Sequence, residues 1–192
     1  GVSLGYKQEY ASLADFDEEA YLYKGTYKAT VAAGDVANEG YDKAAFVGSK
    51  EFVITPRQNT EVNITATIAN ALVKVEVADS FKSYFPGGYE LKLTTAAGNE
   101  FDVTAQTEPL FIAPESFTIS GMGTKQANQS GVEASTIAVP EYKNDQLEAQ
   151  HYYTVKLEVS NVGQATLTVT LNDTIVEEQT FETELNDNSD NA

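Results

Sequence analysis

His151 is the only histidine in the 192-residue chain, so any serine–histidine–aspartate triad or histidine-based metal site would have to use it. The sequence contains no cysteine, which excludes disulfides, zinc fingers, iron–sulfur clusters and cysteine nucleophiles within it. His151 stands directly before Tyr152 and Tyr153, and no G-x-S-x-G motif accompanies it. We therefore interpret His151 as a strand-end side chain beside aromatic rings, and predict no catalytic residue.

Carboxylates are abundant, but their spacing defines no site. Asp15, Asp17, Glu18 and Glu19 form an acidic cluster that lacks the glycine and terminal glutamate of an EF-hand loop, and the acidic residues near the C-terminus fail the same test. No spacing singles out a carboxylate pair for glycoside hydrolysis among the 29 acidic residues. We interpret the cluster as a solvated turn and predict no metal site and no cofactor.

The eleven tyrosines are the remaining side chains that could bind a ligand, because the chain has no tryptophan to stack on sugars. Tyrosine on a strand is more often a core residue than a stacking platform, and we predict the core role. The sequence therefore identifies no ligand-binding residue. The tyrosines considered are Tyr6, Tyr10, Tyr21, Tyr23, Tyr84, Tyr89, Tyr142 and Tyr152.

The segment Gly121-Met122-Gly123-Thr124-Lys125 combines glycines with a lysine. It lacks the G-x-x-x-x-G-K-[ST] spacing that cradles a phosphate. We predict a flexible loop here.

The amino-acid composition limits the classes of partner that this chain can bind. Twelve basic and 29 acidic residues give a net charge of −17. Such a charge disfavours binding to nucleic acid, since no basic patch is visible in the sequence to offset it. No apolar run approaches the 18 residues of a transmembrane helix. The hydrophobic fraction of 42% is too high for a disordered chain. The sequence therefore describes a folded, acidic protein without a membrane-spanning segment.

Alternation with a period of two dominates the chain and predicts β-strands. It is clearest over residues 152–160 and 166–171, which a short loop joins into a hairpin. The same pattern occurs around Val31, Val75, Leu91 and Ile119, and turn signals at Gly34, Gly87, Gly98 and Asn172 separate the runs. Helix is expected only at 79–85, where Asp79 is a candidate cap, and as a short turn at 12–16. The prediction is an all-β, antiparallel sandwich with minimal helix.

The parity of the alternation changes near Asn70. Apolar positions are even over 62–68 and odd over 73–77, so one continuous strand cannot bury both sets on one face. A β-bulge is one explanation; the other, which we favour, is passage into a second sandwich. We therefore predict an N-terminal sandwich portion over residues 1–70, a C-terminal sandwich over 71–184, and an acidic tail or linker over 185–192.

Five stretches resemble a domain family of unknown function found in surface lipoproteins of Bacteroides-type bacteria. They are GTYKATVAAGD (25–35), EGYDKAAFVGSKEFVI (39–54), TEVNITATIANALVKVEVADSFKSYF (60–85), HYYTVKLEVSN (151–161) and ATLTVTLNDTIVEEQ (165–179). The family is similar to fimbrillin-type pilus and adhesion proteins, which implies transthyretin- or immunoglobulin-like β-sandwich domains. Its members usually open with a further strand and a lipid-attached cysteine, so we expect the first sandwich here to lack its first strand.

The resemblance implies an exported protein at the cell surface or anchored to the outer membrane, with tethering through a lipid anchor outside this sequence. It also implies a non-enzymatic structural or adhesion module, such as a spacer, a pilin-like subunit or a scaffold. The alternative function is a glycan-binding module associated with carbohydrate uptake. The expected partners are accordingly other surface-protein subunits or surface glycans.

Overall fold

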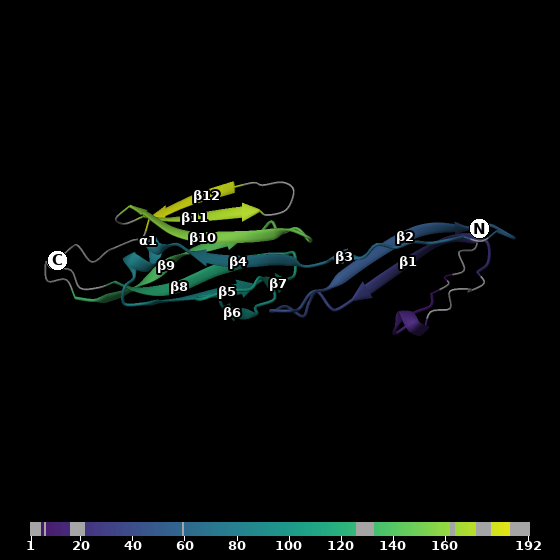
Figure 1. Ribbon diagram of the computed structural model, residues 1–192, viewed down its shortest axis with the longest axis horizontal. Helices are drawn as coiled ribbons and strands as arrows, with labels where there is room; N and C mark the ends of the chain where they lie inside the picture. Colours follow the sequence, from purple (N-terminus) through teal and green to yellow (C-terminus); the bar gives the residue numbers. More distant parts are fainter. Residues whose placement is uncertain are drawn as a thin grey trace. The chain divides into compact units, whose positions relative to one another are not determined.

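A computed structural model describes residues 5, 7–15, 22–58, 60–125, 133–161, 164–171 and 178–184. These residues form twelve strands, one six-residue α-helix and one short 3-10 turn, arranged in three sheets (Figure 1). The strand content and the antiparallel hairpins confirm the predicted all-β sandwich fold with minimal helix. The described residues contain no helix long and apolar enough to cross a membrane.

The largest sheet has five strands in the order β12-β11-β10-β4-β7. The expected hairpin is β10 with β11, paired antiparallel from Tyr153 opposite Leu171. At the centre of the sheet, β4 runs parallel to β10, with Lys74 opposite Thr154, which departs from the purely antiparallel expectation. The strand bounds are β4 Ala71–Val77, β7 Leu110–Ile112, β10 Tyr152–Asn161, β11 Gln164–Leu171 and β12 Glu178–Glu184.

A second sheet has four strands in the order β6-β5-β8-β9. All its pairs are antiparallel, and a register shift between Ile119 and Gly121 bends β8 against β9. The bounds are β5 Tyr89–Thr95, β6 Glu100–Asp102, β8 Phe117–Lys125 and β9 Ser135–Asn144.

The inward side chains of these two sheets form one hydrophobic core. Val73 and Val75 on β4 and Val155 and Leu157 on β10 are buried from one sheet, and Leu93 from the other. Their neighbours in sequence face outward, as strand geometry requires. The alternation of buried and exposed positions along these strands is the one that the period-two pattern predicted for a sandwich.

Helix α1 (Asp79–Tyr84) follows β4 and buries Phe81 in the core. Phe81 packs edge-on against Tyr89 with ring centroids 5.2 Å apart. The predicted cap is wrong: the N-cap residue is Ala78, which makes no side-chain capping bond, and Asp79 is already the first helical residue. Asp79 instead pairs with Lys82, one turn along the helix. The predicted turn at 12–16 contains a 3-10 turn, η1 (Leu13–Asp15).

The third sheet has the order β1-β2-β3, with β1 Gly25–Ala33, β2 Phe46–Ile54 and β3 Thr67–Ile68. The strand expected over 62–68 is wrong in extent, because only its last two residues pair with β2. Upstream, the carbonyl of Thr65 lies against Gly48, so the chain approaches β2 without forming a longer ladder. Between Ile68 and Ala71 the chain passes from this sheet into the five-stranded one, at the position where the parity changes.

Contacts divide the chain into two units, residues 1–29 with 50–63, and residues 30–49 with 64–192. The first unit contains parts of β1 and β2, and Tyr27 stacks on Phe52 there with ring centroids 5.8 Å apart. The sandwich core belongs to the second unit. The predicted boundary near residue 70, with an N-terminal sandwich portion over 1–70 and a C-terminal sandwich over 71–184, stays a prediction.

Several predicted features lie outside the described residues. They are the missing first strand before Val2, the turn at Asn172 and the acidic tail over 185–192.

Candidate functional site

His151 lies immediately before β10, as its place in the sequence predicted. Its ring lies beside Tyr153, with centroids 6.2 Å apart, and its Nε2 atom is 3.7 Å from a carboxylate oxygen of Glu148. Its backbone carbonyl accepts a hydrogen bond from Leu72 N, which connects it to the start of β4. These contacts confirm the interpretation of a strand-end histidine beside an aromatic ring.

The acidic cluster is described only in part. Asp15 ends the 3-10 turn, whereas Asp17, Glu18 and Glu19 lie outside the described residues. Within the described ranges, no three carboxylate or histidine side chains are grouped so as to hold a metal ion.

The tyrosines divide between the core and the surface. Tyr142 is buried against Phe117, and its burial raises the pKa of its hydroxyl to about 12. Tyr84 and Tyr89 pack against the core, and Lys125 lies 4.8 Å above the Tyr84 ring. Tyr23 is 91% exposed and departs from the predicted core role. The remaining predicted members are Tyr10, which is exposed, Tyr152, which is half-buried, and Tyr6 and Tyr21, which lie outside the described residues.

The predicted flexible loop at 121–125 is wrong, because these residues form the second half of strand β8. Both glycines serve close packing. A Cβ atom at Gly121 would collide with the carbonyl of Glu90, and one at Gly123 would collide with the ring of Phe85. Glycine in a strand often marks such a close approach, and the loop interpretation overlooked that alternative.

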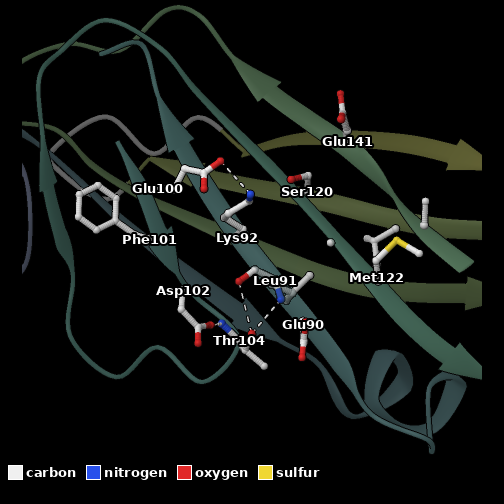
Figure 2. Close-up of a pocket in the computed structure, with 13 residues that line it drawn as sticks. Glu90, Leu91, Lys92, Glu100, Phe101, Asp102, Thr104, Ser120, Met122 and Glu141 are labelled. Carbon is white, nitrogen blue, oxygen red and sulfur yellow. Dashed lines mark hydrogen bonds and ion pairs between the residues drawn. The ribbon is translucent and has the colours of Figure 1, made fainter. Parts of the chain in front are cut away.

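A hollow lined by both charged and apolar side chains lies on the outward side of the four-stranded sheet (Figure 2). Strand β5 turns Leu91 and Leu93 into the core, and this places Glu90 and Lys92 on the opposite face. Register brings Met122 opposite Glu90 and Ser120 opposite Lys92. The other lining side chains include Glu100, Asp102 and Thr104 on one flank and Ala138 and Glu141 on the other.

The charges of the hollow are mostly negative. Lys92 is its one lining cation and forms an ion pair with Glu100, 2.8 Å from Nζ to Oε1. Asp102 accepts a hydrogen bond from the backbone N–H of Thr104 at 2.9 Å, and hydrogen bonds from Thr104 lower the pKa of its carboxyl group. Glu90 and Glu141 form no ion pair with another described residue. The hollow therefore presents uncompensated carboxylates around the exposed thioether of Met122.

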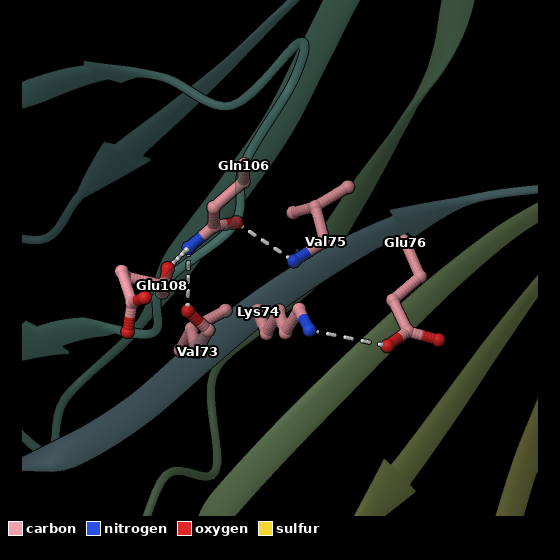
Figure 3. A network of polar contacts seen from close by, with 6 residues as sticks. All are labelled: Val73, Lys74, Val75, Glu76, Gln106 and Glu108. Atoms are coloured by element: carbon pink, nitrogen blue, oxygen red, sulfur yellow. Dashed lines mark hydrogen bonds and ion pairs between the residues drawn. The ribbon is translucent and has the colours of Figure 1, made fainter.

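The segment after β6 uses side chains in place of strand partners. The Thr104 hydroxyl accepts a hydrogen bond from Leu91 N at 2.8 Å and so extends the pairing of β5 beyond the end of β6. Two residues later, Gln106 does the same for β4 in the other sheet (Figure 3). Residues 103–109 thus connect the edges of both sheets.

Gln106 closes an edge of β4 that β7 leaves open. Strand β7 pairs with β4 only as far as Val73. Beyond that point the Gln106 amide accepts a hydrogen bond from Val75 N at 2.8 Å and donates one to Val73 O at 2.9 Å. It also donates to Glu108 O, which holds the side chain in place. The amide therefore satisfies backbone groups that a further strand would otherwise pair with.

Hydrogen bonds to Glu39 attach the loop between β1 and β2 to the sandwich. Its carboxylate accepts hydrogen bonds from Thr95 Oγ1 at 2.6 Å, Asn99 Nδ2 at 2.8 Å and Ala113 N at 2.9 Å. The adjacent Gly40 exchanges two backbone hydrogen bonds with Phe111. This carboxylate has a structural role that its position in a loop did not reveal.

Exposed cations are concentrated in the first unit. Lys24, Lys28, Lys50 and Arg57 are all exposed, and none forms an ion pair with another described residue. Tyr23 and Val53, which is 58% exposed, add apolar surface beside them in the sequence. We call residues 22–29 and 50–58 the ribbon.

Neither the hollow nor the ribbon was identified from sequence. Lys92 and the alternation of β5 were visible, but the pairing of β5 with β8 that brings Met122 opposite Glu90 was not. The ribbon had a usable signal, because four of the twelve basic residues fall within it.

Comparisons with curated proteins and with solved structures found no match to this chain. One family model, described as Domain of unknown function (DUF4493), matches residues 1–187 and so covers nearly the whole sequence. The match extends over the three sheets, the hollow and the ribbon alike. The chain therefore belongs to the DUF4493 family.

Proposed function

We propose that this chain is a non-enzymatic structural or adhesion module of an exported, lipid-anchored protein at the bacterial cell surface. The observation that carries the proposal is the ribbon, in which exposed strands, cations and apolar side chains are combined. Exposed strands and loops on a rigid scaffold are common recognition surfaces. The resemblance to fimbrillin-like surface proteins supports the same role and location.

Three polar side chains that could have belonged to a reactive site have structural contacts instead, and this supports the proposal indirectly. Glu39 holds a loop, Gln106 closes a strand edge, and His151 packs at the start of a strand. Each is engaged with the protein's own backbone or rings. In the proposed role the sandwich supplies rigidity, and recognition takes place on its outer surfaces.

A glycan-binding module is the second candidate, and the hollow is the observation that favours it. Its lysine, serine and carboxylate side chains are suitable partners for sugar hydroxyls. Its aromatic contribution is Phe101, and none of its lining residues is a tyrosine that could stack on a sugar ring.

Two measurements test the location and the role. Protease treatment of intact cells that express the full-length protein should release fragments of this chain; protection in intact cells but not in lysed ones would overturn the surface location. Microspheres coated with the chain should attach to surfaces coated with the same chain or with other surface proteins. Attachment no greater than that of albumin-coated microspheres would overturn the adhesive role.

A glycan array separates the candidates. We expect no glycan to bind or to be cleaved. Binding that is lost in a Glu90→Ala/Ser120→Ala variant, with the melting temperature unchanged, would establish the glycan-binding alternative in place of adhesion. Release of shortened glycans would overturn the non-enzymatic assignment.

A further inference from the structure

The ribbon has a charge opposite to that of the chain as a whole. Lys24, Lys28, Lys50 and Arg57 against Glu51 give it a net charge of +3, whereas the complete chain carries −17. An exposed cation in so acidic a protein would be expected to find a carboxylate nearby. These four are exposed, and none forms an ion pair with another described residue.

The ribbon also has no buried side chain. Tyr27, Phe52 and Ile54 are only half-buried, and every buried side chain identified in the described residues belongs to the second unit. No described residue of the ribbon is buried under a second layer, and two strands on their own are marginally stable in water. Tyr23 and Val53 leave apolar area exposed in addition. The ribbon would therefore gain stability from a surface that covers it.

The hollow has the complementary properties. Glu90, Asp102 and Glu141 line it, and its only lining cation is neutralised by Glu100. Met122 stands among them with 46% of its surface exposed, and the neighbouring Ala138 is exposed as well. An apolar patch beside carboxylates that form no ion pair with a described cation suits a partner that carries exposed apolar side chains between cations.

We propose that the occupant of the hollow is the ribbon of a second copy of this chain. The inference deepens the proposed structural and adhesive function and rests on it. The contact joins two different surfaces, so every open assembly keeps one ribbon free at one end and one hollow free at the other. Such a heterologous contact builds rings or open filaments rather than closed two-fold dimers.

The strength of this contact should depend on the salt concentration. Copies with a charge of −17 repel each other at long range, but at 0.15 M salt charges separated by more than about 8 Å are largely screened. Short-range pairing of ribbon cations with hollow carboxylates then dominates. The association should weaken again near 1 M salt, where the screening length falls to about 3 Å.

Sedimentation velocity over a concentration series provides the test. We expect the wild-type chain to form dimers and longer assemblies at 0.15 M salt. Lys28→Glu/Lys50→Glu, which reverses the ribbon, and Glu90→Lys/Glu141→Lys, which reverses the hollow, should each weaken self-association at least about tenfold, because like charges then face each other. Lys43→Glu/Lys82→Glu lowers the net charge by the same amount as the ribbon variant, at exposed positions outside both surfaces, and should associate as the wild type does.

Mixing the two reversed variants makes the test specific. The acidic ribbon of one variant matches the basic hollow of the other, so the mixture should form mixed assemblies more strongly than either variant associates alone. Thermal melts of each variant serve as the folding control. All four changed side chains are exposed, so their melting temperatures should match that of the wild type.

Two results would overturn the inference: a wild-type chain that stays monomeric throughout the concentration series, or assemblies that both reversed variants form as readily as the wild type. Surface exposure and attachment to other proteins are measured separately on cells and microspheres. Their success together with a monomeric chain would reject only the self-association. Their failure would reject the proposed function itself.

Discussion

Strands β1 and β4 show the same alternation in sequence but very different burial in the fold. In β4 the residues Ala71, Val73 and Val75 are completely or almost completely removed from solvent. In β1 the equivalent residues Tyr27, Ala29 and Val31 are only half-buried. The difference arises because β4 faces a second sheet across the core. Alternation therefore predicts that a strand forms, whereas the depth of its burial depends on a second layer.

The largest difference in stability should appear when one aromatic ring is truncated in the sandwich core and one in the ribbon. Phe81→Ala removes a ring that contacts Phe85 and Tyr89 in the core and should destabilise the protein by about 3–5 kcal/mol. Phe52→Ala, on the ribbon, should cost far less because its ring is only half-buried. Urea unfolding curves measure both values. Equal losses would show that the ribbon is as tightly packed as the core.

Glycines provide a second matched pair. Gly123→Ala places a methyl group against the ring of Phe85 and should cost about 1–3 kcal/mol by overpacking. Gly25→Ala on β1 meets only Tyr27 Cε2 at 3.6 Å, an ordinary contact, and should change stability by less than about 0.5 kcal/mol. A melting temperature unchanged in both variants would contradict the close approach at β8.

Side chains that bond to strand backbones can be compared in the same way. Gln106→Ala leaves Val75 N and Val73 O without this amide and should cost about 1–3 kcal/mol. Thr60→Ala removes an exposed hydrogen bond of 3.2 Å to Val53 O in the first unit and should have little effect. Hydrogen exchange of the Val75 amide gives a local readout. Unchanged protection in Gln106→Ala would show that another group closes this edge.

Burial should also be visible in the alkaline pH dependence of stability. The folded pKa of Tyr142 is raised to about 12 from its ordinary value of 10, so the unfolded chain loses this proton first as the pH rises. Its contribution to stability is complete below pH 10 and is lost as the pH rises towards 12. Tyr142→Phe should flatten this part of the stability profile relative to the wild type. Parallel profiles would argue against burial of the hydroxyl.

The smallest effect is expected on the ribbon. Tyr23→Ser should alter the stability of the monomer by less than about 0.5 kcal/mol, because 91% of the side chain is already exposed. The same change should weaken self-association, as seen by sedimentation. A large loss of monomer stability would mean that Tyr23 packs within a single copy.

The fold class followed from sequence because alternation and turn residues are local signals. Val155 and Leu157 were recognisable as inward-facing residues without knowledge of their neighbours. The turns at Gly34, Gly88 and Gly98 have positive φ angles, in agreement with the turn signals around them. These features need no information about distant parts of the chain.

Features that depend on distant pairing could not be predicted. Glu39 binds groups at positions 95, 99 and 113, and nothing near it in sequence indicates those partners. The hollow depends on the register of β5 with β8, and β4 lies beside β10 although their sequences are far apart. Gly121 and Gly123 were misread for the same reason, because the groups that exclude a side chain there come from other segments.

The parallel pairing of β4 with β10 has a consequence for biosynthesis. Lys74 meets Thr154 in this ladder, so the central partner of β4 leaves the ribosome roughly eighty residues later. At ~5–20 residues per second, this delay amounts to about 4–16 s. During that interval β4 lacks its longest neighbour, and contacts between such remote segments form slowly. The nascent chain therefore exposes an apolar strand for seconds, and this segment is prone to aggregation until the five-stranded sheet closes.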